Sequence, residues 1–343
     1  MKNTMKKLTS LMMAGTLLAG CSSAPASSNQ AAQESAPKEK VTIGVAQIVD
    51  HPSLNTIRDA IIDELEVQGY KDGETAVIKY QNAANQISNL DTIMSGYASD
   101  KADIIIAIAT PTAQSAQNFS DKVPVIFSAV SDPVGAGLVK SLNKPGGNVT
   151  GTSDEVQVDQ ICDLIGELTP SAKTVGVLYN AGEANSVSNV KKFKEYAASK
   201  GLKVVEKTGT DLTTLQQAAS VLCQDVDVLF SPNDNTVASG MAALSQIALK
   251  AKVPYYVGAD SMVKDGGFAT VGIDYEALGR ETALMAVNVL NGNDPAEMPV
   301  KVFKDDLNVY INQNDFDQLS KSSKVPVQIP DSVKNSDKLV MVK

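Results

Sequence analysis

The chain has 343 residues, of which 43% are hydrophobic, so it can form two domains of ordinary size with separate cores. Its net charge of −9 and the lack of a basic patch argue against nucleic-acid binding. The single histidine, His51, is too few for a histidine-based triad or a two-histidine metal site. The sequence also has no phosphate-binding glycine motif, so we expect neither a cofactor nor an enzyme.

The N-terminus has the pattern of a targeting segment. Lysines within the first seven positions precede an apolar run at residues 8–19, which is too short to span a bilayer comfortably. The run ends in Leu-Ala-Gly-Cys, which resembles the bacterial lipobox and implies a lipid (palmitate) anchor on Cys21. We therefore expect a signal peptide at residues 1–20. Residues 21–40, rich in Ser, Ala, Gln and Pro, are expected to form a disordered tether.

From residue 41 onward, short β-branched runs alternate with amphipathic helical stretches. This βαβαβαβ order predicts an α/β fold with a parallel, doubly wound sheet. The run at residues 104–108 is apolar throughout and predicts a strand buried on both faces. The predicted strands are residues 41–46, 76–80, 104–108 and 125–129, and the predicted helices are residues 53–68, 87–98 and 113–119.

The second half of the chain repeats the first. Residues 226–240, VDVLFSPNDNTVASG, match residues 102–116, ADIIIAIATPTAQSA, and Thr-Val-Gly-Val at 174–177 matches Thr-Ile-Gly-Val at 42–45. Two copies predict two similar lobes whose strand ends face each other across a cleft. Cys162 and Cys223 lie in apolar, helix-like stretches of this half and are expected to be core residues, although the sequence leaves a disulfide between them open.

Further elements follow the second copy. We predict a helix at residues 156–168, strands at 268–273 and 307–311, helices at 275–290 and 315–319, and a loose tail beyond residue 327. The chain is expected to pass between the lobes near Gly151, near Gly272 and near Val302. The predicted lobes are residues 41–151 plus 272–302 and residues 152–271 plus 303–330.

Polar residues cluster where the predicted strands end, which is where open α/β sheets bind ligands. At each position a helix cap or a solvated loop residue is the alternative, and for Ser53, Asp211 and Thr213 we expect a cap. The candidate ligand-binding residues are Gln47, His51, Thr110, Thr112, Gln114, Ser128, Ser131, Asp132, Tyr179, Glu183, Asn185, Asp234, Asn235 and Asp260. Tyr179 could stack on an aromatic ligand or belong to the core.

The two copies differ in charge at equivalent strand ends. Thr110-Pro111-Thr112 predicts a helix start with a hydroxyl at the N-cap and proline at the first helical position, where free N–H groups favour a carboxylate. In the second copy, the position equivalent to Thr110 holds Asp234. The position equivalent to Val130, which is neutral, holds Asp260. We therefore predict a zwitterionic ligand. Its carboxylate would bind the first lobe, and its ammonium group would bind the two acids with Asn235 and Glu183.

Four stretches together resemble a known family: QIVDHP at residues 47–52, FSAVSDPV at 127–134, YNAGEANS at 179–186 and SPNDN at 231–235. They are similar to the ABC-transporter substrate-binding lipoproteins of the tryptophan/tyrosine type, in the type I periplasmic-binding-protein superfamily. The resemblance extends over about residues 41–319. Ala181 departs from it, since relatives often have proline there.

This resemblance implies two Rossmann-like lobes, joined by three crossovers, that close on an aromatic amino acid. It also implies delivery to ABC permease and ATPase subunits from a monomer anchored on the extracytoplasmic face of the cell membrane. Tryptophan, tyrosine, phenylalanine, a branched-chain amino acid or another small solute stay open as the ligand. A surface sensor that presents its ligand to a membrane receptor is the alternative function. A transcription regulator of this superfamily is disfavoured by the lipobox and by the lack of a helix-turn-helix segment.

Overall fold

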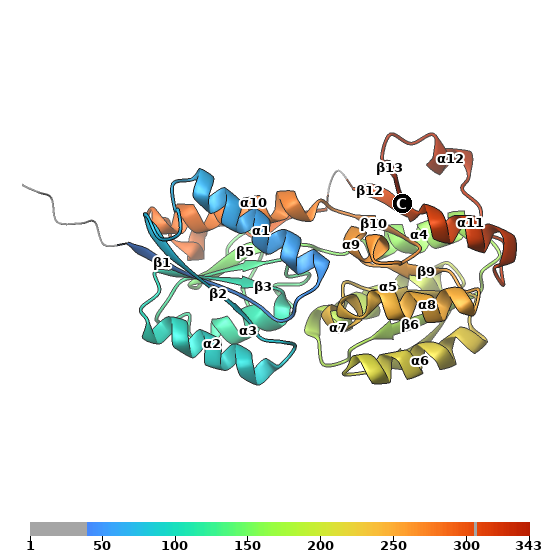
Figure 1. The fold of residues 1–343 in the computed structure, drawn as a ribbon, viewed down its shortest axis with the longest axis horizontal. Helices are drawn as coiled ribbons and strands as arrows, with labels where there is room; N and C mark the ends of the chain where they lie inside the picture. The colour runs from blue at the N-terminus through green and yellow to red at the C-terminus, as the bar shows by residue number, and fades with distance from the viewer. Residues whose placement is uncertain (1–39, 305–306) are drawn as a thin grey trace, which may run out of the picture. The chain divides into compact units, whose positions relative to one another are not determined.

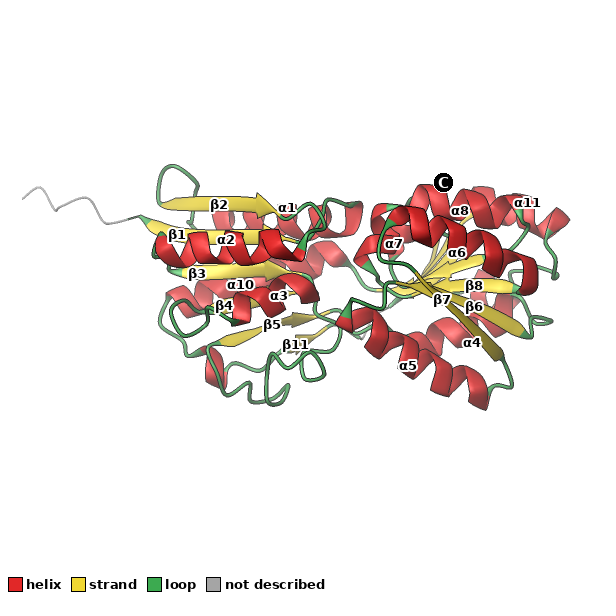
Figure 2. Cartoon of the chain, turned by 90° about the horizontal axis from the view of Figure 1, so that it is seen from below, coloured by secondary structure: helices red, strands yellow, loops and turns green. Residues whose placement is uncertain are grey.

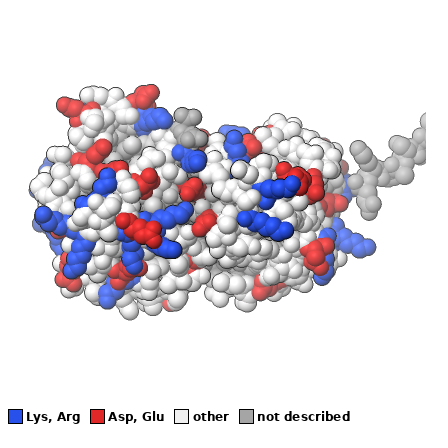
Figure 3. Space-filling model, turned by 180° about the vertical axis from the view of Figure 1, so that it is seen from behind, with Lys and Arg blue, Asp and Glu red and all other residues white. Residues whose placement is uncertain are grey.

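The computed structural model describes residues 40–304 and 307–343, and the chain is shown in Figure 1. The predicted signal peptide, Cys21 and nearly all of the predicted tether lie outside the described residues. Within the described ranges, no helix combines the length and apolarity needed to cross a membrane. The lysine, arginine, aspartate and glutamate side chains are interspersed on the face seen in Figure 3.

The first lobe is built on a six-stranded sheet in which every pair of neighbouring strands is parallel, in the order β11-β5-β4-β3-β1-β2. Helices α1 and α10 cover one face, and α2 and α3 cover the other (Figure 1). The strands are β1 (Val41–Gln47), β2 (Ala76–Asn82), β3 (Ile104–Ile108), β4 (Val125–Ser128), β5 (Val149–Ser153) and β11 (Lys301–Val302). The helices are α1 (Pro52–Val67), α2 (Ile87–Ser99), α3 (Thr110–Gln117), α10 (Tyr275–Leu290) and a 3-10 turn at Pro295–Glu297.

Strand β3 is buried on both faces, as its apolar sequence predicts. Ile104 and Ile106 share a core with α1 and α10, whereas Ile105 and Ala107 share another with α2 and α3. The side chains of a strand point alternately to opposite faces of its sheet. One short run of residues therefore supplies both cores of this lobe.

The second lobe is built on a seven-stranded sheet in the order β13-β12-β10-β9-β8-β6-β7. Its strands are β6 (Thr174–Tyr179), β7 (Lys203–Thr208), β8 (Val228–Ser231), β9 (Tyr255–Val257), β10 (Ala269–Gly272), β12 (Asn308–Asn312) and β13 (Leu339–Val342). Its helices are α4 (Val158–Leu168), α5 (Ala184–Ser199), α6 (Leu212–Asp225), α7 (Asn235–Ser239), α8 (Met241–Lys250), α9 (Asp260–Lys264), α11 (Gln313–Ser322) and α12 (Asp331–Lys334). Asp211 caps α6 as predicted, and Thr213 lies inside that helix instead of capping it.

Two features of this lobe differ from the sequence-based expectation. Strand β12 runs antiparallel to β10, so the second sheet is mixed. The tail beyond residue 327 is not loose, because it forms α12 and then β13, which pairs with β12. Its apolar residues Leu339 and Met341 pack against the core of the lobe. The short apolar run at residues 339–342 is therefore the edge strand of the second sheet, although the local sequence pattern does not predict a strand there.

The duplication seen in the sequence is visible in the backbone. Both sheets contain the strand order 2-1-3-4-5, with β2-β1-β3-β4-β5 in the first and β7-β6-β8-β9-β10 in the second. The side chain of Asp103 accepts a hydrogen bond from the N–H of Thr42 at 2.7 Å. In the second copy, Asp227 accepts one from the N–H of Thr174 at 2.9 Å. The matching aspartates thus join the beginnings of two neighbouring strands, β1 and β3 in the first lobe and β6 and β8 in the second, in the same way.

The chain passes between the lobes three times, so the predicted pair of α/β lobes joined by three crossovers is confirmed. The three crossings, here called the hinge, are residues 154–157, residues 273–274 and the connection from β11 to β12, of which residues 303–304 and 307 are described. The strands of the first sheet point toward the second lobe (Figure 2). Both cysteines of the second lobe, Cys162 and Cys223, are buried free thiols, which answers the question of a disulfide between them.

Candidate functional site

A cavity lies between the lobes, at the strand ends where the sequence places its polar clusters. Its volume is about 20 Å³, which is room for about one water molecule, so a larger ligand requires the lobes or side chains to move. The lining residues from the first lobe are His51, Ser53, Leu54, Ile57, Ala109, Thr110 and Ala129. Those from the second lobe are Asn185, Asn233, Asn235, Ala238, Ala259 and Met262, and the hinge side adds Asp154 and Tyr275.

Two residues of the loop between β3 and α3 line the cavity: Ala109, whose backbone is strained, and Thr110, whose hydroxyl is unpaired. Ala109 is the N-cap of α3 with φ of 77°, a left-handed conformation that costs a non-glycine residue free energy. Thr110 is therefore the first helical residue and not the N-cap that the sequence predicts, and Pro111 is the second. The hydroxyl of Thr110 is buried and has no hydrogen-bond partner among the residues that the structure describes. It is thus available to a ligand at the start of the helix.

His51 follows β1 and is buried at the start of α1. Its Nε2 lies 3.4 Å from Oδ1 of Asn235 in the other lobe, and its Nδ1 has no partner. Burial lowers the pKa of His51 to about 4, against the smaller opposing effects of Asn235 and Asp50. The imidazole is therefore neutral at pH 7. Nearby, Ser53 is the second residue of α1 and not its cap, and its hydroxyl contacts that of Ser261 across the cleft.

Asp154 is the one carboxylate among the residues that line this cavity. It directly follows β5 on the first hinge segment. Its Oδ1 accepts a hydrogen bond from Ser131 at 2.9 Å, and its Oδ2 accepts bonds from Asn233 at 2.6 Å and from the hydroxyl of Tyr275 at 3.0 Å. Burial raises the pKa of Asp154 to about 6, and the three donors limit the rise. No lysine or arginine lines the cavity beside it, so its charge faces the cavity without a cation.

Asp234 and Glu183 do not line the cavity, in contrast to their predicted role with an ammonium group. Asp234 caps α7 through the N–H of Val237 and also accepts bonds from the N–H of Asn180 and the hydroxyl of Ser186. Burial and the neighbouring Glu183 raise the pKa of Asp234.

Both oxygens of the Glu183 carboxylate also accept hydrogen bonds from the protein itself. It accepts four bonds from the backbone and side chains of Asn235 and Thr236. Both acids therefore hold the loop between β8 and α7 in place.

Asp260 also lies outside the set of residues that line the cavity. One of its oxygens pairs with Lys264 at 2.7 Å, which supplies the basic partner that the sequence does not reveal, and the other is buried without a partner. Because Lys264 follows Asp260 by four residues on α9, the pair is a local helix contact.

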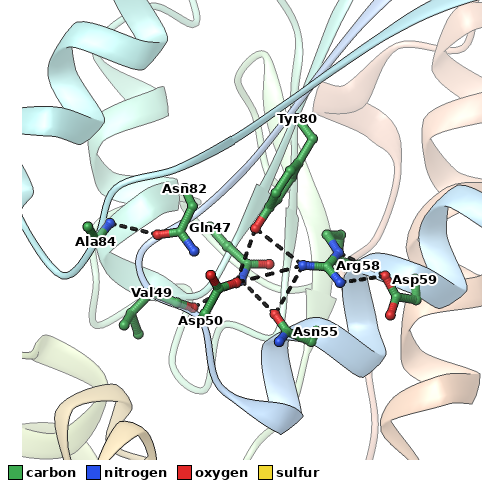
Figure 4. A network of polar contacts seen from close by, with 9 residues as sticks. All are labelled: Gln47, Val49, Asp50, Asn55, Arg58, Asp59, Tyr80, Asn82 and Ala84. Carbon is green, nitrogen blue, oxygen red and sulfur yellow. Dashed lines mark hydrogen bonds and ion pairs between the residues drawn. The ribbon is translucent and has the colours of Figure 1, made fainter.

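Gln47 belongs to a polar network beside the cavity, drawn in Figure 4. Its amide nitrogen donates to Asp50 at 3.0 Å and to Asn55 at 2.9 Å. Arg58 contacts the same Asn55 at 3.1 Å and the hydroxyl of Tyr80 at 3.3 Å. The network therefore joins β1 to α1 and β2, next to the loop that carries His51, and Gln47 does not line the cavity.

The other predicted residues have different partners. Ser128 is bonded to Thr282 of α10 at 2.8 Å, and Gln114 donates to the carbonyl of Ala136. Tyr179 donates to Glu206 of the neighbouring strand β7 at 3.0 Å, and the hydroxyl of Thr112 is buried without a partner among the described residues. Of the fourteen candidates, the four that line the cavity are His51, Thr110, Asn185 and Asn235.

Comparison with known proteins gives the family. The family model described as "ABC transporter substrate binding protein" matches residues 42–338. The chain belongs to this family. It is 42% identical over 315 residues to a "Tyrosine-binding protein" of Clostridioides difficile (strain R20291), covering 90% of this chain and 91% of the relative. These relatives are substrate-binding proteins and not enzymes.

Two solved structures of the substrate-binding family differ in how well they overlay. An ABC domain in complex with L-Trp from Streptococcus pneumonia has a TM-score of 0.82 at 38% identity, covering 88% of this chain and 100% of the other. The ligand-free, open structure of a substrate-binding protein from Clostridium difficile has a TM-score of 0.65 at 42% identity, with the same coverage. The arrangement of this chain is thus more similar to the complex than to the open form.

Asp154, Tyr275 and Asn233 are cavity residues that were not among the candidates. Asp154 directly follows the buried strand β5. The expectation that ligands bind where strands end would have included Asp154 if it had been applied to this strand as well. Tyr275 begins a helix whose preceding strand lies in the other lobe. Only the folded arrangement brings its hydroxyl to Asp154.

Proposed function

We propose that this substrate-binding protein of an ABC transporter takes an aromatic L-amino acid, tyrosine or tryptophan, between its lobes and delivers it to a membrane permease. The observation that carries the proposal is a set of unpaired buried polar atoms on the cavity wall. Nδ1 of His51, Oγ1 of Thr110 and Oδ1 of Asn185 have no partner among the described residues. Because a buried polar group without a hydrogen bond costs free energy, these atoms favour a polar ligand.

The charge of the cavity favours a ligand with an ammonium group. Asp154 presents a carboxylate that accepts bonds only from neutral donors, so a cation would complete its surroundings. Thr110, at the positive end of α3, is the corresponding site for a carboxylate. Leu54, Ile57 and Met262 supply apolar wall for a side chain. A relative at 42% identity is named for tyrosine, and one at 38% is solved with L-Trp.

The test compares variants of two acids and two classes of ligand. Asp154→Asn should weaken binding of L-tyrosine and L-tryptophan well over tenfold, because a buried charge-assisted contact is lost. Asp260→Asn, a matched change outside the cavity, should leave the affinity within about threefold. Because the chain contains no tryptophan, the fluorescence of L-tryptophan reports its binding directly. A deaminated aryl propionate that binds as tightly as the amino acid would exclude the ammonium assignment.

Binding should also depend on pH through Asp154. Its pKa of about 6 means that the carboxylate is charged above that pH, while the ligand's ammonium stays protonated below about pH 8. Affinity should therefore rise from pH 5 to pH 7 and level off, by up to about tenfold per pH unit at the acidic end. Isothermal titration at several pH values measures this, and Asp154→Asn should flatten the profile.

We further propose that residues 1–20 are removed as a signal peptide and that Cys21 carries the lipid anchor, with residues 22–40 as the tether. The Leu-Ala-Gly-Cys sequence supports this assignment. In cells fed labelled palmitate, the wild-type protein should carry the label and Cys21→Ser should not. Equal labelling of both would contradict it. The lipid then holds a monomeric binding protein outside the cytoplasm, beside its permease and ATPase subunits.

A further inference from the structure

Asp132 was predicted to bind ligand, but its carboxylate contacts the other lobe. It follows β4 in the first lobe and does not line the cavity. Its Oδ2 accepts a hydrogen bond of 2.6 Å from the hydroxyl of Ser188, which lies on α5 of the second lobe. Both side chains are half-buried. This contact therefore joins the lobes outside the residues that would surround a ligand.

The turn that carries Asp132 leaves this oxygen free for the other lobe. Its second oxygen, Oδ1, accepts the N–H of Gly135 at 2.8 Å and so closes the turn on itself. A Cβ atom at Gly135 would lie 2.3 Å from Oδ2, closer than two such atoms can approach. A side chain at position 135 would therefore displace Oδ2 from the place where Ser188 reaches it.

The charge of Asp132 strengthens the contact. Burial alone would raise its pKa, but the hydrogen bonds from Ser188 and Gly135 and the charge of Lys192 outweigh burial and hold the pKa below its usual range. Lys192 lies one helical turn after Ser188 on α5 and also pairs with Glu155 of the hinge at 3.2 Å. The carboxylate is therefore ionised at neutral pH, and the bond from Ser188 is of the stronger, charge-assisted kind.

We propose that the bond between Asp132 and Ser188 is a latch that forms when the lobes close, and that it sets how long the ligand stays bound. Ser188 lies on helix α5 of the second lobe and Asp132 on a turn of the first that is closed by Gly135, so separating the lobes breaks the bond. An interaction present in only one of two conformations shifts the equilibrium toward that conformation. This inference rests on the proposed function and adds two residues that act on release without touching the ligand.

The first test removes the hydroxyl of Ser188. In stopped-flow measurements with L-tryptophan, Ser188→Ala should raise the dissociation rate constant about tenfold and leave the association rate constant within about twofold. Ser199→Ala is the matched control, because Ser199 lies on the same helix and donates only to the carbonyl of Tyr196. The control should release ligand at the wild-type rate. An unchanged rate in Ser188→Ala, or an equal rise in the control, overturns the latch.

A second test asks whether Asp132 acts through Ser188. Gly135→Ala places a Cβ against Oδ2 and should raise the dissociation rate in the same direction. The double variant Ser188→Ala/Asp132→Ala should release ligand no faster than the faster single variant, because each change removes the same bond. Effects that multiply would mean that the two residues act independently of each other, which overturns the latch.

A failure of the proposed function can be distinguished from a failure of the latch by the binding of the wild-type protein. If wild-type protein binds neither L-tryptophan nor L-tyrosine, the proposed function is wrong. The latch is then tested by small-angle X-ray scattering of the free proteins, in which Ser188→Ala should have a larger radius of gyration than wild type or Ser199→Ala. Equal radii for all three overturn it.

Discussion

The loops after β3 and β8 occupy the same place in the two copies of the fold, yet they do opposite things with their polar groups. In the first lobe, Thr110 starts α3 with a buried hydroxyl that has no partner and lines the cavity. In the second, Asp234 uses both oxygens to cap α7 and to fix the adjoining loop through Asn180 and Ser186. A shared topology thus fixes where a side chain stands, and local hydrogen bonds decide whether it is free for a ligand.

The largest effect that would sharpen this comparison is on stability. Asp234→Ala leaves the buried N–H of Val237, the partly buried N–H of Asn180 and the hydroxyl of Ser186 without their acceptor. We therefore expect the free energy of unfolding in urea to fall by about 2–3 kcal/mol. Relief of the repulsion with Glu183 keeps the loss from being larger. If Asp234→Ala is as stable as wild type but no longer binds ligand, the two loops are alike and the comparison fails.

The next effect compares twin glycines on the first strand of each copy, Gly44 on β1 and Gly176 on β6. A Cβ at Gly44 would lie 2.6 Å from the ring of Tyr97, whose hydroxyl is fixed by bonds of 2.8 Å to the carbonyls of Val45 and Lys79. At Gly176 the obstacle is a methyl group of Leu229 at 2.8 Å, which can rotate away.

Gly44→Ala should therefore lower the free energy of unfolding by about 2 kcal/mol, and Gly176→Ala by about 1 kcal/mol. Urea denaturation of both variants measures the difference. The reverse order would show that the second lobe is the more tightly packed of the two.

The smallest effect is on affinity and comes from the first lobe. Thr110→Val keeps the shape of the side chain and removes a hydroxyl that has no partner in the free protein, so stability should change by less than about 0.5 kcal/mol. Binding of the aromatic amino acid should weaken about fivefold, the value of one hydrogen bond. Thr112→Val is the control, since that hydroxyl is also unpaired but does not line the cavity. Equal losses in both variants would remove Thr110 from the site.

The sequence by itself determined the two-lobed α/β fold. Alternating β-branched runs and amphipathic stretches act over a few residues, and the internal repeat shows that the pattern occurs twice. The buried strand β3 and the matching roles of Asp103 and Asp227 follow from those local signals. The expectation that ligands bind where the parallel strands end also directed attention to the sheet edges at which the cavity lies, and His51, Thr110, Asn185 and Asn235 line that cavity.

Only the tertiary structure decided which polar groups face the cavity. Acids such as Asp234 and Glu183 look free in the sequence, but neighbouring backbone N–H groups and hydroxyls occupy their oxygens. Asp154 is held at the cavity by hydrogen bonds from Ser131, more than twenty positions away, and from Tyr275, more than a hundred positions away. Likewise, β13 is a strand because β12 offers it an edge. Contacts between distant segments depend on how the whole chain closes, and no pattern within a short window of sequence contains that information.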